Sequence, residues 1–424
     1  MSTKIGFGIS TITPRVGAEL DGYRDRPGPS TGIHDELHSR SLVVEADDGI
    51  WALCASELLF VTATMTQRIR DRVTAQVPIL AESIHICTVH NHSGPRDLSA
   101  EDWDVPLEDL IAASVVQAYE NRVPARIGFG RGRLDGHSVN RRFLDCPTDP
   151  GMAVLKVEDL NGRILGLVVN WGCHAVVMGP DNLLISADYP GVVSSELESR
   201  AGDGSVALFV NGGCGDVNPV TSGVRTTLDG SHPIRTMVPG VTYYQPNPTS
   251  PTVHIGHRHG GTFAEVEELG HAVADEAWRV AERAYMREPV GTPWTATARL
   301  NLRRPDADPI SSEKWVRRFL GDWSGEVEVA ALGIDEFALV GEPGEVFAET
   351  FVELKRELWQ MGFQVTMTAG YMNGGFGYLP PREAFAEGGY EIDMAKRLGL
   401  REDTQERMRR KIIAMVLPFA SIHK

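Results

Sequence analysis

Long apolar runs are missing from this chain of 424 residues. No stretch approaches the ~20 consecutive apolar residues that a helix needs to cross a bilayer. The first ten residues, MSTKIGFGIS, also lack the charged start and the long apolar segment of a secretory signal. The sequence therefore predicts a cytoplasmic protein without a membrane-spanning segment.

Positive charge is in short supply. The chain has 41 Lys and Arg residues against 57 Asp and Glu residues, and its formal net charge is −16. Nucleic acids and anionic membranes are polyanions, and an acidic surface repels both. We therefore expect a small-molecule substrate, with neither nucleic acid nor membrane as a partner. The sequence leaves open whether the protein is a homo-oligomer.

Cysteine is scarce as well, and an odd number of cysteines cannot all pair. The five are Cys54, Cys87, Cys146, Cys173 and Cys214. Four of them stand within apolar runs or glycine-rich turns, as buried thiols of cytoplasmic proteins do. This pattern predicts free cysteines and no disulfide framework.

Strand and helix patterns alternate along the chain. Two pairs of β-rich runs flank turn signals, at 47–49 and at Asn161-Gly162, and each pair predicts a hairpin. Apolar residues at helical spacing predict helices over 62–77, 106–122 and 188–200, the last with Asp188 as its N-cap. A strand, a turn and a long helix are expected over 336–358, and a further strand before the glycine-rich loop at 370–377.

This alternation, interrupted by hairpins, indicates an α/β fold of the mixed α+β kind, with helices flanking a mixed parallel and antiparallel sheet. No linker composition divides the chain, so we predict one domain over residues 1–424. The segment 221–261 is rich in Pro, Thr, Gly, Tyr and His, and we expect a long irregular loop there.

The stretch ICTVHNHSGP, residues 86–95, contains two histidines at the end of an apolar run. If residues 83–92 form one strand, alternation places the side chains of His90 and His92 on the same face. Ligands bind at such strand ends in open sheets, so the pair is a candidate site. The alternative is that two polar residues merely mark where the strand ends.

Other candidate groups follow later strands. His174 ends an apolar run, and it is either a metal ligand or a hydrogen-bonded structural residue. The turn NGGCGDVNP exposes backbone N–H groups at Gly213 and Gly215 that could form an oxyanion hole. Cys214 in this turn is a conceivable nucleophile without an obvious base, and Asp216 could equally bond its own backbone.

The stretch GEPGE follows a strand and opens a helix, so Glu342 or Glu345 is either a ligand or a carboxylate favoured by the helix dipole. Histidines and a glutamate at the ends of separate strands are the usual ligands of a catalytic zinc ion. For the remaining histidine groups we favour a solvated loop in HIGHRHG and a structural role in GIHDELHSR. These histidines are His254, His257, His259, His34 and His38.

These pieces, in this order, resemble the neutral (non-lysosomal) ceramidase family. The stretches that carry the resemblance are GFGISTITPRVG, GIHDELHSRSLVV, TVHNHSGP, VNRR, NWGCHAVVMGPDNLLISADYPG, NGGCGDVNP and GEPGE, followed by the late tyrosine stretch. The resemblance implies a zinc ion bound by His90, His174, Glu345 and Tyr378. It also implies that His92 lines the substrate site, and that Arg141, after Asn140, and Tyr390 contact substrate.

One position departs from the family pattern. The resemblance implies a catalytic serine in G-D-x-S-P, where this chain has Asn218, and an amide is no nucleophile. The chain also ends soon after the tyrosine stretch, so we expect the C-terminal β-sandwich domain of ceramidases to be missing. We therefore expect a substrate other than ceramide.

The function predicted from these residues is a zinc-dependent hydrolase. It would cleave an amide, a cyclic amide or a lactone of a small polar molecule, with hydroxide formed at the zinc ion as the attacking group. His92 would move the proton, and Arg141, Asn218 and Tyr390 would orient the substrate or stabilise negative charge. The predicted binding contacts are completed by Asn140, Gly213, Gly215 and Asp216.

Three alternatives stay open at this point. The same metal could polarise a sugar or a hydroxy acid for isomerisation or elimination. The protein could also be a metal-bearing binding protein without catalysis. Finally, the resemblance could reflect the fold alone, in which case His90 and His174 would lie far apart or be occupied by hydrogen bonds.

Overall fold

The structure is a computed structural model, and it describes residues 2–47, 49–96, 98, 102–143, 146, 148–222, 261–307 and 323–420. Most of the long loop predicted over 221–261, including the HIGHRHG stretch, lies outside these residues.

An eight-stranded mixed sheet forms the largest layer, with the strand order β11-β9-β8-β6-β1-β3-β4-β5. Its strands are β1 (Lys4–Thr11), β3 (His38–Ala46), β4 (Gly49–Ser56), β5 (Ile84–Thr88), β6 (Val123–Arg133), β8 (Gly151–Asp159), β9 (Ile164–Trp171) and β11 (Val206–Asn211). β4 pairs in parallel with β5, and β9 with β11, while the other pairs are antiparallel. Both predicted hairpins, β3–β4 and β8–β9, are confirmed.

A second sheet packs against one face of the first. It contains β13 (Trp294–Asn301), β14 (Glu326–Ile334), β15 (Phe337–Gly341) and β17 (Val365–Ala369), and β15 and β17 are parallel. Apolar side chains of both sheets, such as Phe7, Leu339 and Met367, form one core between them. Trp51 also belongs to this core, and its indole N–H donates to the carbonyl of Gly333 in the other sheet at 3.1 Å.

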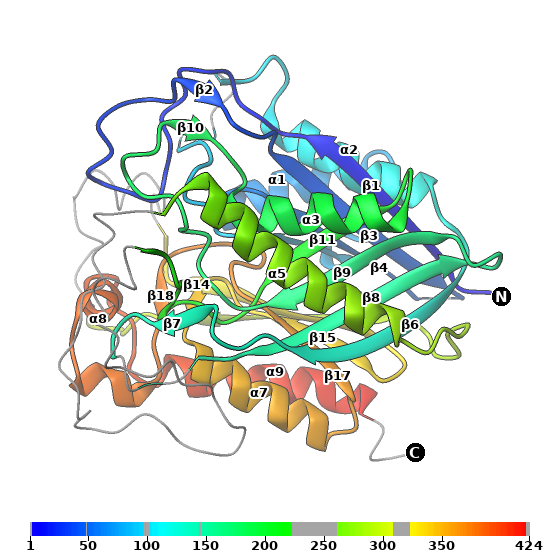
Figure 1. The fold of residues 1–424 in the computed structure, drawn as a ribbon. Coiled ribbons are helices and arrows are strands. Elements are labelled where there is room, and N and C mark those ends of the chain that lie inside the picture. Colours follow the sequence, from blue (N-terminus) through cyan, green and yellow to red (C-terminus); the bar gives the residue numbers. More distant parts are fainter. Residues whose placement is uncertain are drawn as a thin grey trace.

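Helices cover the two outer faces, so the layers run helix, sheet, sheet, helix (Figure 1). α1 (Ala63–Thr74), α2 (Leu107–Glu120), α3 (Asp188–Ala201) and α5 (Phe263–Glu282) pack on the large sheet. α7 (Ala348–Gln360) and α9 (Thr404–Val416) pack on the small one. Their amphipathic spacing explains this arrangement, since α5 buries Val266, Leu269, Val273 and Val280 on one face. The mixed fold class predicted from the sequence is confirmed.

The prediction that Asp188 caps α3 is wrong. The cap position belongs to Ala187, and Asp188 is the first helical residue, with a left-handed φ of 56°. Its buried carboxylate accepts backbone N–H groups of Met178 at 3.0 Å and Tyr189 at 2.8 Å. Burial raises the pKa of Asp188 to about 6. The side chain therefore fixes the loop after β9 instead of capping the helix.

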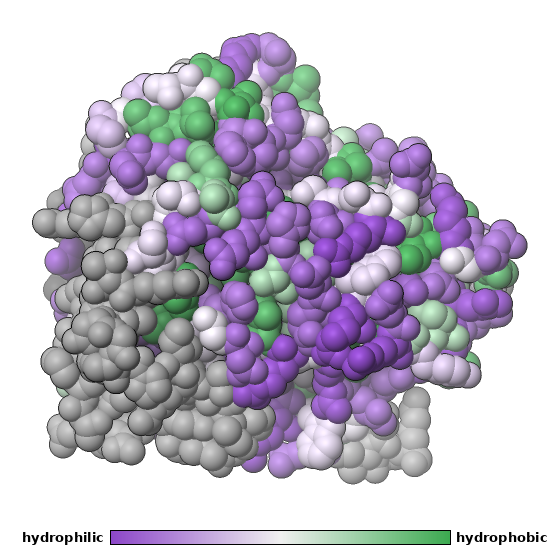
Figure 2. Space-filling model, in the orientation of Figure 1, coloured by the Kyte–Doolittle hydropathy of each residue, from purple (hydrophilic) through white to green (hydrophobic). Residues whose placement is uncertain are grey.

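The outer surface agrees with the composition. Figure 2 shows a mainly hydrophilic face on which hydrophobic residues form small separate groups. Within the described residues, no helix is both long and apolar enough to span a membrane. None of the five cysteines, all of which lie in the described residues, forms a disulfide, and four of them are buried, as predicted.

Three short strand pairs tie the loops at one end of the two sheets. They are β2 (Gly32–Ile33) with β10 (Leu184–Ile185), β7 (Ser138–Asn140) with β12 (Val217–Pro219), and β16 (Glu345–Val346) with β18 (Tyr378–Leu379). One strand of each of the first two pairs and both strands of the third follow the carboxyl ends of parallel strands: β10 follows β9, β12 follows β11, β16 follows β15 and β18 follows β17. That end is where an open sheet usually carries its site.

Candidate metal centre

The side chains of His90 and His92 lie close together, but the prediction that one strand over residues 83–92 places them on the same face is wrong. β5 ends at Thr88, and His90 has a left-handed φ of 62°. Asn91 then forms a β-bridge with Ala175, and its side-chain amide donates to the carbonyls of Glu57 and Ser186. This turn, and not alternation along a strand, brings the Nε2 atoms of His90 and His92 to 3.2 Å.

His174 and Glu345 complete the cluster from two other loops. His174 follows β9, and its Nε2 lies 3.2 Å from Oε2 of Glu345. The same carboxylate oxygen lies 3.4 Å from Nε2 of His90. The two histidines therefore do not lie far apart, as they would if the resemblance concerned the fold alone. Of the two glutamates in GEPGE, Glu345 faces the histidines.

Hydrogen bonds behind the rings orient both imidazoles. Nδ1 of His90 lies 3.1 Å from the carbonyl of Leu59, and Nδ1 of His174 contacts the carbonyls of Cys214 and Val217. A carbonyl only accepts, so Nδ1 carries a proton in each ring and Nε2 is the ring nitrogen directed at Glu345.

The protonation states favour a cation at this point. Burial and the nearby Arg141 charge lower the pKa of His174 to about 4, so this ring is neutral at pH 7. Burial opposes ionisation of Glu345, but His90 and His174 outweigh it and hold the pKa of this carboxyl well below its ordinary value. The ionised carboxylate of Glu345 and the neutral ring of His174 then face one another, and a cation between them would stabilise both.

The spacing of these atoms fits zinc. Four ligands held 2.0–2.1 Å from a tetrahedral centre stand about 3.3–3.4 Å from one another. The observed separations of 3.2 and 3.4 Å match this edge length. Buried His92 lies in the same group, since one nitrogen each of His90, His92 and His174 falls within 4.8 Å of the others. The donor set therefore fits a zinc ion held by His90, His174 and Glu345.

Comparison of the sequence with models of known protein families gives a match over most of the chain. The model of the neutral/alkaline non-lysosomal ceramidase family, N-terminal part, matches residues 3–287. The chain belongs to this family.

Curated ceramidases are similar over about half of the chain. Neutral ceramidase A of Dictyostelium discoideum is 28% identical over 269 residues, which cover 54% of this chain and 37% of that protein. Neutral ceramidase of Pseudomonas aeruginosa is 26% identical over 247 residues, covering 51% of this chain and 37% of that protein. The matched region thus spans less than two-fifths of these relatives.

Two solved structures share the fold. A structure described as ceramidase complexed with C2 matches with a TM-score of 0.78 at 19% identity, covering 99% of this chain and 75% of that one. The crystal structure of neutral ceramidase from Pseudomonas aeruginosa matches with a TM-score of 0.76 at 19% identity, covering 99% and 74%. The ceramidase-family fold therefore extends beyond the matched residues 3–287 to nearly the whole chain.

Arg141 connects the cluster to the tyrosines. Its Nη1 lies 3.2 Å from Nε2 of His174, and its Nη2 donates to the Tyr378 hydroxyl at 2.9 Å. Tyr390, at the start of α8 (Tyr390–Arg397), is 52% exposed and stands edge-on to Tyr378. The structure thus places both tyrosines beside the site. That Tyr378 binds the metal stays a prediction, because its observed partner is Arg141.

Asn218 faces the same guanidinium. Its side-chain oxygen lies 3.5 Å from Nη1 of Arg141, at the outer limit of a hydrogen bond. Asn218 is 3% exposed and belongs to β12, which pairs with β7 just before Arg141. Asn218 is therefore beside the predicted catalytic groups.

Three of the residues predicted to contact substrate have hydrogen-bond partners within the protein. Asn140 donates to Asp216 at 2.8 Å, and the other oxygen of Asp216 accepts the N–H of Ala348 at the start of α7. The N–H of Gly215 donates to the carbonyl of Val346 at 2.8 Å, so it is not available for an oxyanion. A Cβ at Gly215 would lie 2.4 Å from the carbonyl oxygen of Glu345, which explains the glycine by close packing. A substrate contact at Gly213 stays a prediction.

Cys214 is not a nucleophile at neutral pH. Its thiol is buried and contacts the Tyr371 hydroxyl at 3.3 Å, and burial raises its pKa to about 12. The thiol is therefore protonated, and only the thiolate is reactive. Tyr371 also stacks on His90 with 4.1 Å between the ring centroids. The sequence carried no signal for this tyrosine.

The N-terminal segment contributes residues that the sequence did not reveal. Tyr23 stands edge-on to the His92 ring, and Arg26 donates to the His92 carbonyl at 2.6 Å. Gly22 lies so close that an added Cβ would be 2.3 Å from Nδ1 of His92. Tyr23 and Gly22 therefore pack against the His92 ring, and Arg26 holds its backbone.

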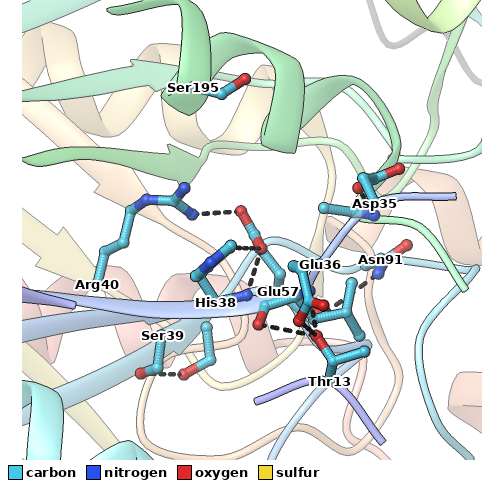
Figure 3. Close-up of polar contacts among 12 residues, drawn as sticks. Thr13, Asp35, Glu36, His38, Ser39, Arg40, Glu57, Asn91 and Ser195 are labelled. Atoms are coloured by element: carbon cyan, nitrogen blue, oxygen red, sulfur yellow. Dashed lines mark hydrogen bonds and ion pairs between the residues drawn. The ribbon is translucent and has the colours of Figure 1, made fainter. Parts of the chain in front are cut away.

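A buried ion pair supports the loop behind His90. Figure 3 shows the Arg40 guanidinium and the His38 side chain directed at the Glu57 carboxylate. Arg40 bonds Glu57 at 2.5 Å and also Glu198 at 2.7 Å. Glu57 begins the segment 57–59, whose carbonyls hold Asn91 and His90. His38 therefore has the structural role expected of it. His34 has one too, since it bonds Asp35 and stacks on Phe263.

Proposed function

We propose that this protein is a zinc-dependent hydrolase of a C–N amide bond, or of a cyclic amide or lactone, in a small polar substrate. The observation that carries the proposal is the convergence of Nε2 of His90, Nε2 of His174 and Oε2 of Glu345 at one buried point. Membership of a family whose named relatives are ceramidases, which cleave an amide, supports the reaction class.

Zinc, when bound, would supply a Lewis acid that polarises a carbonyl and lowers the pKa of water. The chain's own residues would do the rest. His92 has its Nε2 3.2 Å from that of His90 and is 8% exposed, so it is placed to accept a proton from water and return it to the leaving group.

Arg141 would stabilise the negative charge that develops on the carbonyl oxygen. It is almost completely buried, and its interactions with Tyr378, Glu391 and Glu345 outweigh the effect of burial, so the pKa of its guanidinium lies above the ordinary value. A permanent cation at 3.2 Å from His174 is in place before the reaction begins. Exposed Tyr390 would border the entrance.

Asn218 favours water as the attacking group. An amide cannot form an acyl intermediate, and its oxygen is oriented by Arg141. A substrate other than ceramide belongs to this proposal, because the residue beside the catalytic groups has changed from the family pattern.

The test is turnover in H₂¹⁸O with a panel of N-acyl, cyclic amide and lactone substrates, with zinc and with chelator. We expect one solvent oxygen in the product and loss of turnover in chelator that zinc restores. A product that contains no solvent oxygen would contradict hydrolysis and favour isomerisation or elimination. Inactivity across the panel, combined with amidase activity in Asn218→Ser, would instead favour a binding protein.

A further inference from the structure

Glu342 is the glutamate of GEPGE that does not face the histidines. It is fully buried at the start of the turn between β15 and β16. Its Oε2 accepts one hydrogen bond, from the Gln405 side chain at 3.1 Å. Its Oε1 is buried without a hydrogen-bond partner among the described residues. A carboxylate with one neutral donor and no cation is costly to bury.

Gln405 uses its second amide hydrogen on the strand that carries Tyr378. Its Nε2 donates to the carbonyl of Leu379 at 3.0 Å. Leu379 belongs to β18, which pairs in parallel with β16, and Glu345 lies opposite Tyr378 in this pairing. One side chain of α9 thus connects the start of the Glu345 turn to the neighbouring strand.

Among the described residues, no charged side chain forms an ion pair with Glu342. The charged side chains of α9 next to Gln405 have their own partners, since Glu406 bonds Arg382 and Arg409 bonds Glu357. On the other segments, Glu345 faces the histidines and Tyr378 bonds Arg141. Burial therefore raises the pKa of Glu342 to about 8, against which the Gln405 hydrogen bond acts only weakly.

We propose that Glu342, as a neutral carboxylic acid, is a positioning residue that holds Glu345 and Tyr378 in register through Gln405. The inference rests on the proposed metal site, because Glu345 is one of its ligands. Loss of the proton places an anion in this interior, and because burial disfavours the anion, ionisation favours conformations in which the turn opens to water. Metal affinity then falls as the pH rises through the pKa of Glu342, about 8.

The matched variants are Glu342→Gln, which keeps a neutral group of the same shape, and Glu342→Ala, which removes it. Zinc affinity is measured by competition with a chromogenic chelator between pH 6 and pH 10. We expect the affinity of the wild type to fall above pH 8, relative to that of Glu342→Gln, which keeps it. Glu342→Ala and Gln405→Leu should each bind zinc about 10- to 100-fold more weakly at every pH, as for lost outer-shell partners. An identical alkaline decline in wild type and Glu342→Gln, or wild-type affinity in Glu342→Ala, overturns the proposal.

A second readout needs no metal, so it separates this proposal from the proposed function. Amide hydrogen exchange is measured in the metal-free protein at pH 7, in the peptides that contain β16 and β18. We expect faster exchange in Glu342→Ala than in the wild type, and wild-type exchange in Glu342→Gln. Unchanged exchange in Glu342→Ala would show that Glu342 does not hold the two strands. A wild type that exchanges as expected but binds no zinc would contradict the metal site itself.

Discussion

Replacement of Arg40 by Met tests the support behind the metal centre. The side chains of Arg40 and Glu57 are only 5% and 4% exposed, and they form an ion pair at 2.5 Å. Arg40→Met would leave the Glu57 carboxylate buried without its guanidinium partner, and Glu198 would lose its ion-pair partner as well. Breaking a buried pair from one side costs about 3–5 kcal/mol, and we expect this loss in the free energy of unfolding at pH 7.

The assay is a urea titration followed by tryptophan fluorescence, which reports on buried Trp51 and Trp171. Arg15→Met is the matched control, because the Arg15–Asp104 pair is exposed, with side chains 58% and 87% accessible. It should cost about 1 kcal/mol or less. The double variant Arg40→Met/Glu57→Met removes both charges, and it should lose much less than the sum of the single variants.

The pH dependence has a defined sign. Burial opposes ionisation of Glu57, but Arg40 and His38 outweigh it and lower the pKa of this carboxyl. The stabilisation is therefore present above the ordinary glutamate pKa of 4.5 and disappears as the pH falls through the lower folded-state value. The difference between wild type and Arg40→Met should shrink in acid. A loss below about 1 kcal/mol at pH 7 would refute the assignment of this pair as a buried support.

Three further predictions concern the site directly. His92→Gln should still bind zinc, as measured by elemental analysis. Its kcat should fall roughly 10²- to 10⁴-fold, because the residue that transfers the proton is gone. Full activity would exclude His92 as the proton-transfer residue. In Gly22→Ala, the added Cβ would lie 2.3 Å from the His92 ring. This variant should therefore lose at least about tenfold in kcat, while circular dichroism shows an unchanged secondary-structure content. A wild-type kcat would contradict the contact. Brief alkylation of the native protein at pH 8, read by mass spectrometry, should modify half-buried Cys146 and spare Cys214, whose pKa is raised to about 12 by burial; rapid labelling of Cys214 would contradict its burial.

Local patterns predicted the elements well. Hairpins with Asp-Gly or Asn-Gly turns and helices with apolar periodicity depend on neighbouring residues, and both hairpins formed as expected. The helix predicted over 62–77 begins after Thr62 but ends already at Thr74. The second sheet was not predicted. Parallel pairing of β15 with β17 and the packing of two sheets depend on contacts between distant segments, which no local pattern encodes.

For the site, residue types at strand ends were informative, but their geometry was not. The positions of His90 and His174 after apolar runs make them candidates, the resemblance adds Glu345 rather than Glu342, and the three converge. The predicted alternation along a strand does not explain the closeness of His90 and His92, because His90 has a left-handed φ and turns the chain. Asn140 and Asp216 bond each other, and their contact with substrate stays a prediction. The prediction of a single domain over residues 1–424 stays a prediction.

Partners of the site residues left no trace in the sequence. Glu391, which accepts from Arg141 at 2.8 Å, stands 250 positions away from it. Tyr371, stacked on His90, comes from the other sheet's loops. Such contacts depend on the tertiary fold, and a single amino-acid sequence does not reveal them.

The metal content of the purified protein tests the central claim most directly. Elemental analysis is done on the wild type, on Glu345→Ala and on Glu342→Gln as a control in the same turn. The account predicts one zinc ion per chain in the wild type and in Glu342→Gln, and loss of zinc in Glu345→Ala. A wild type that stays metal-free after incubation with zinc, or a Glu345→Ala variant that binds zinc as tightly as the wild type, would contradict it.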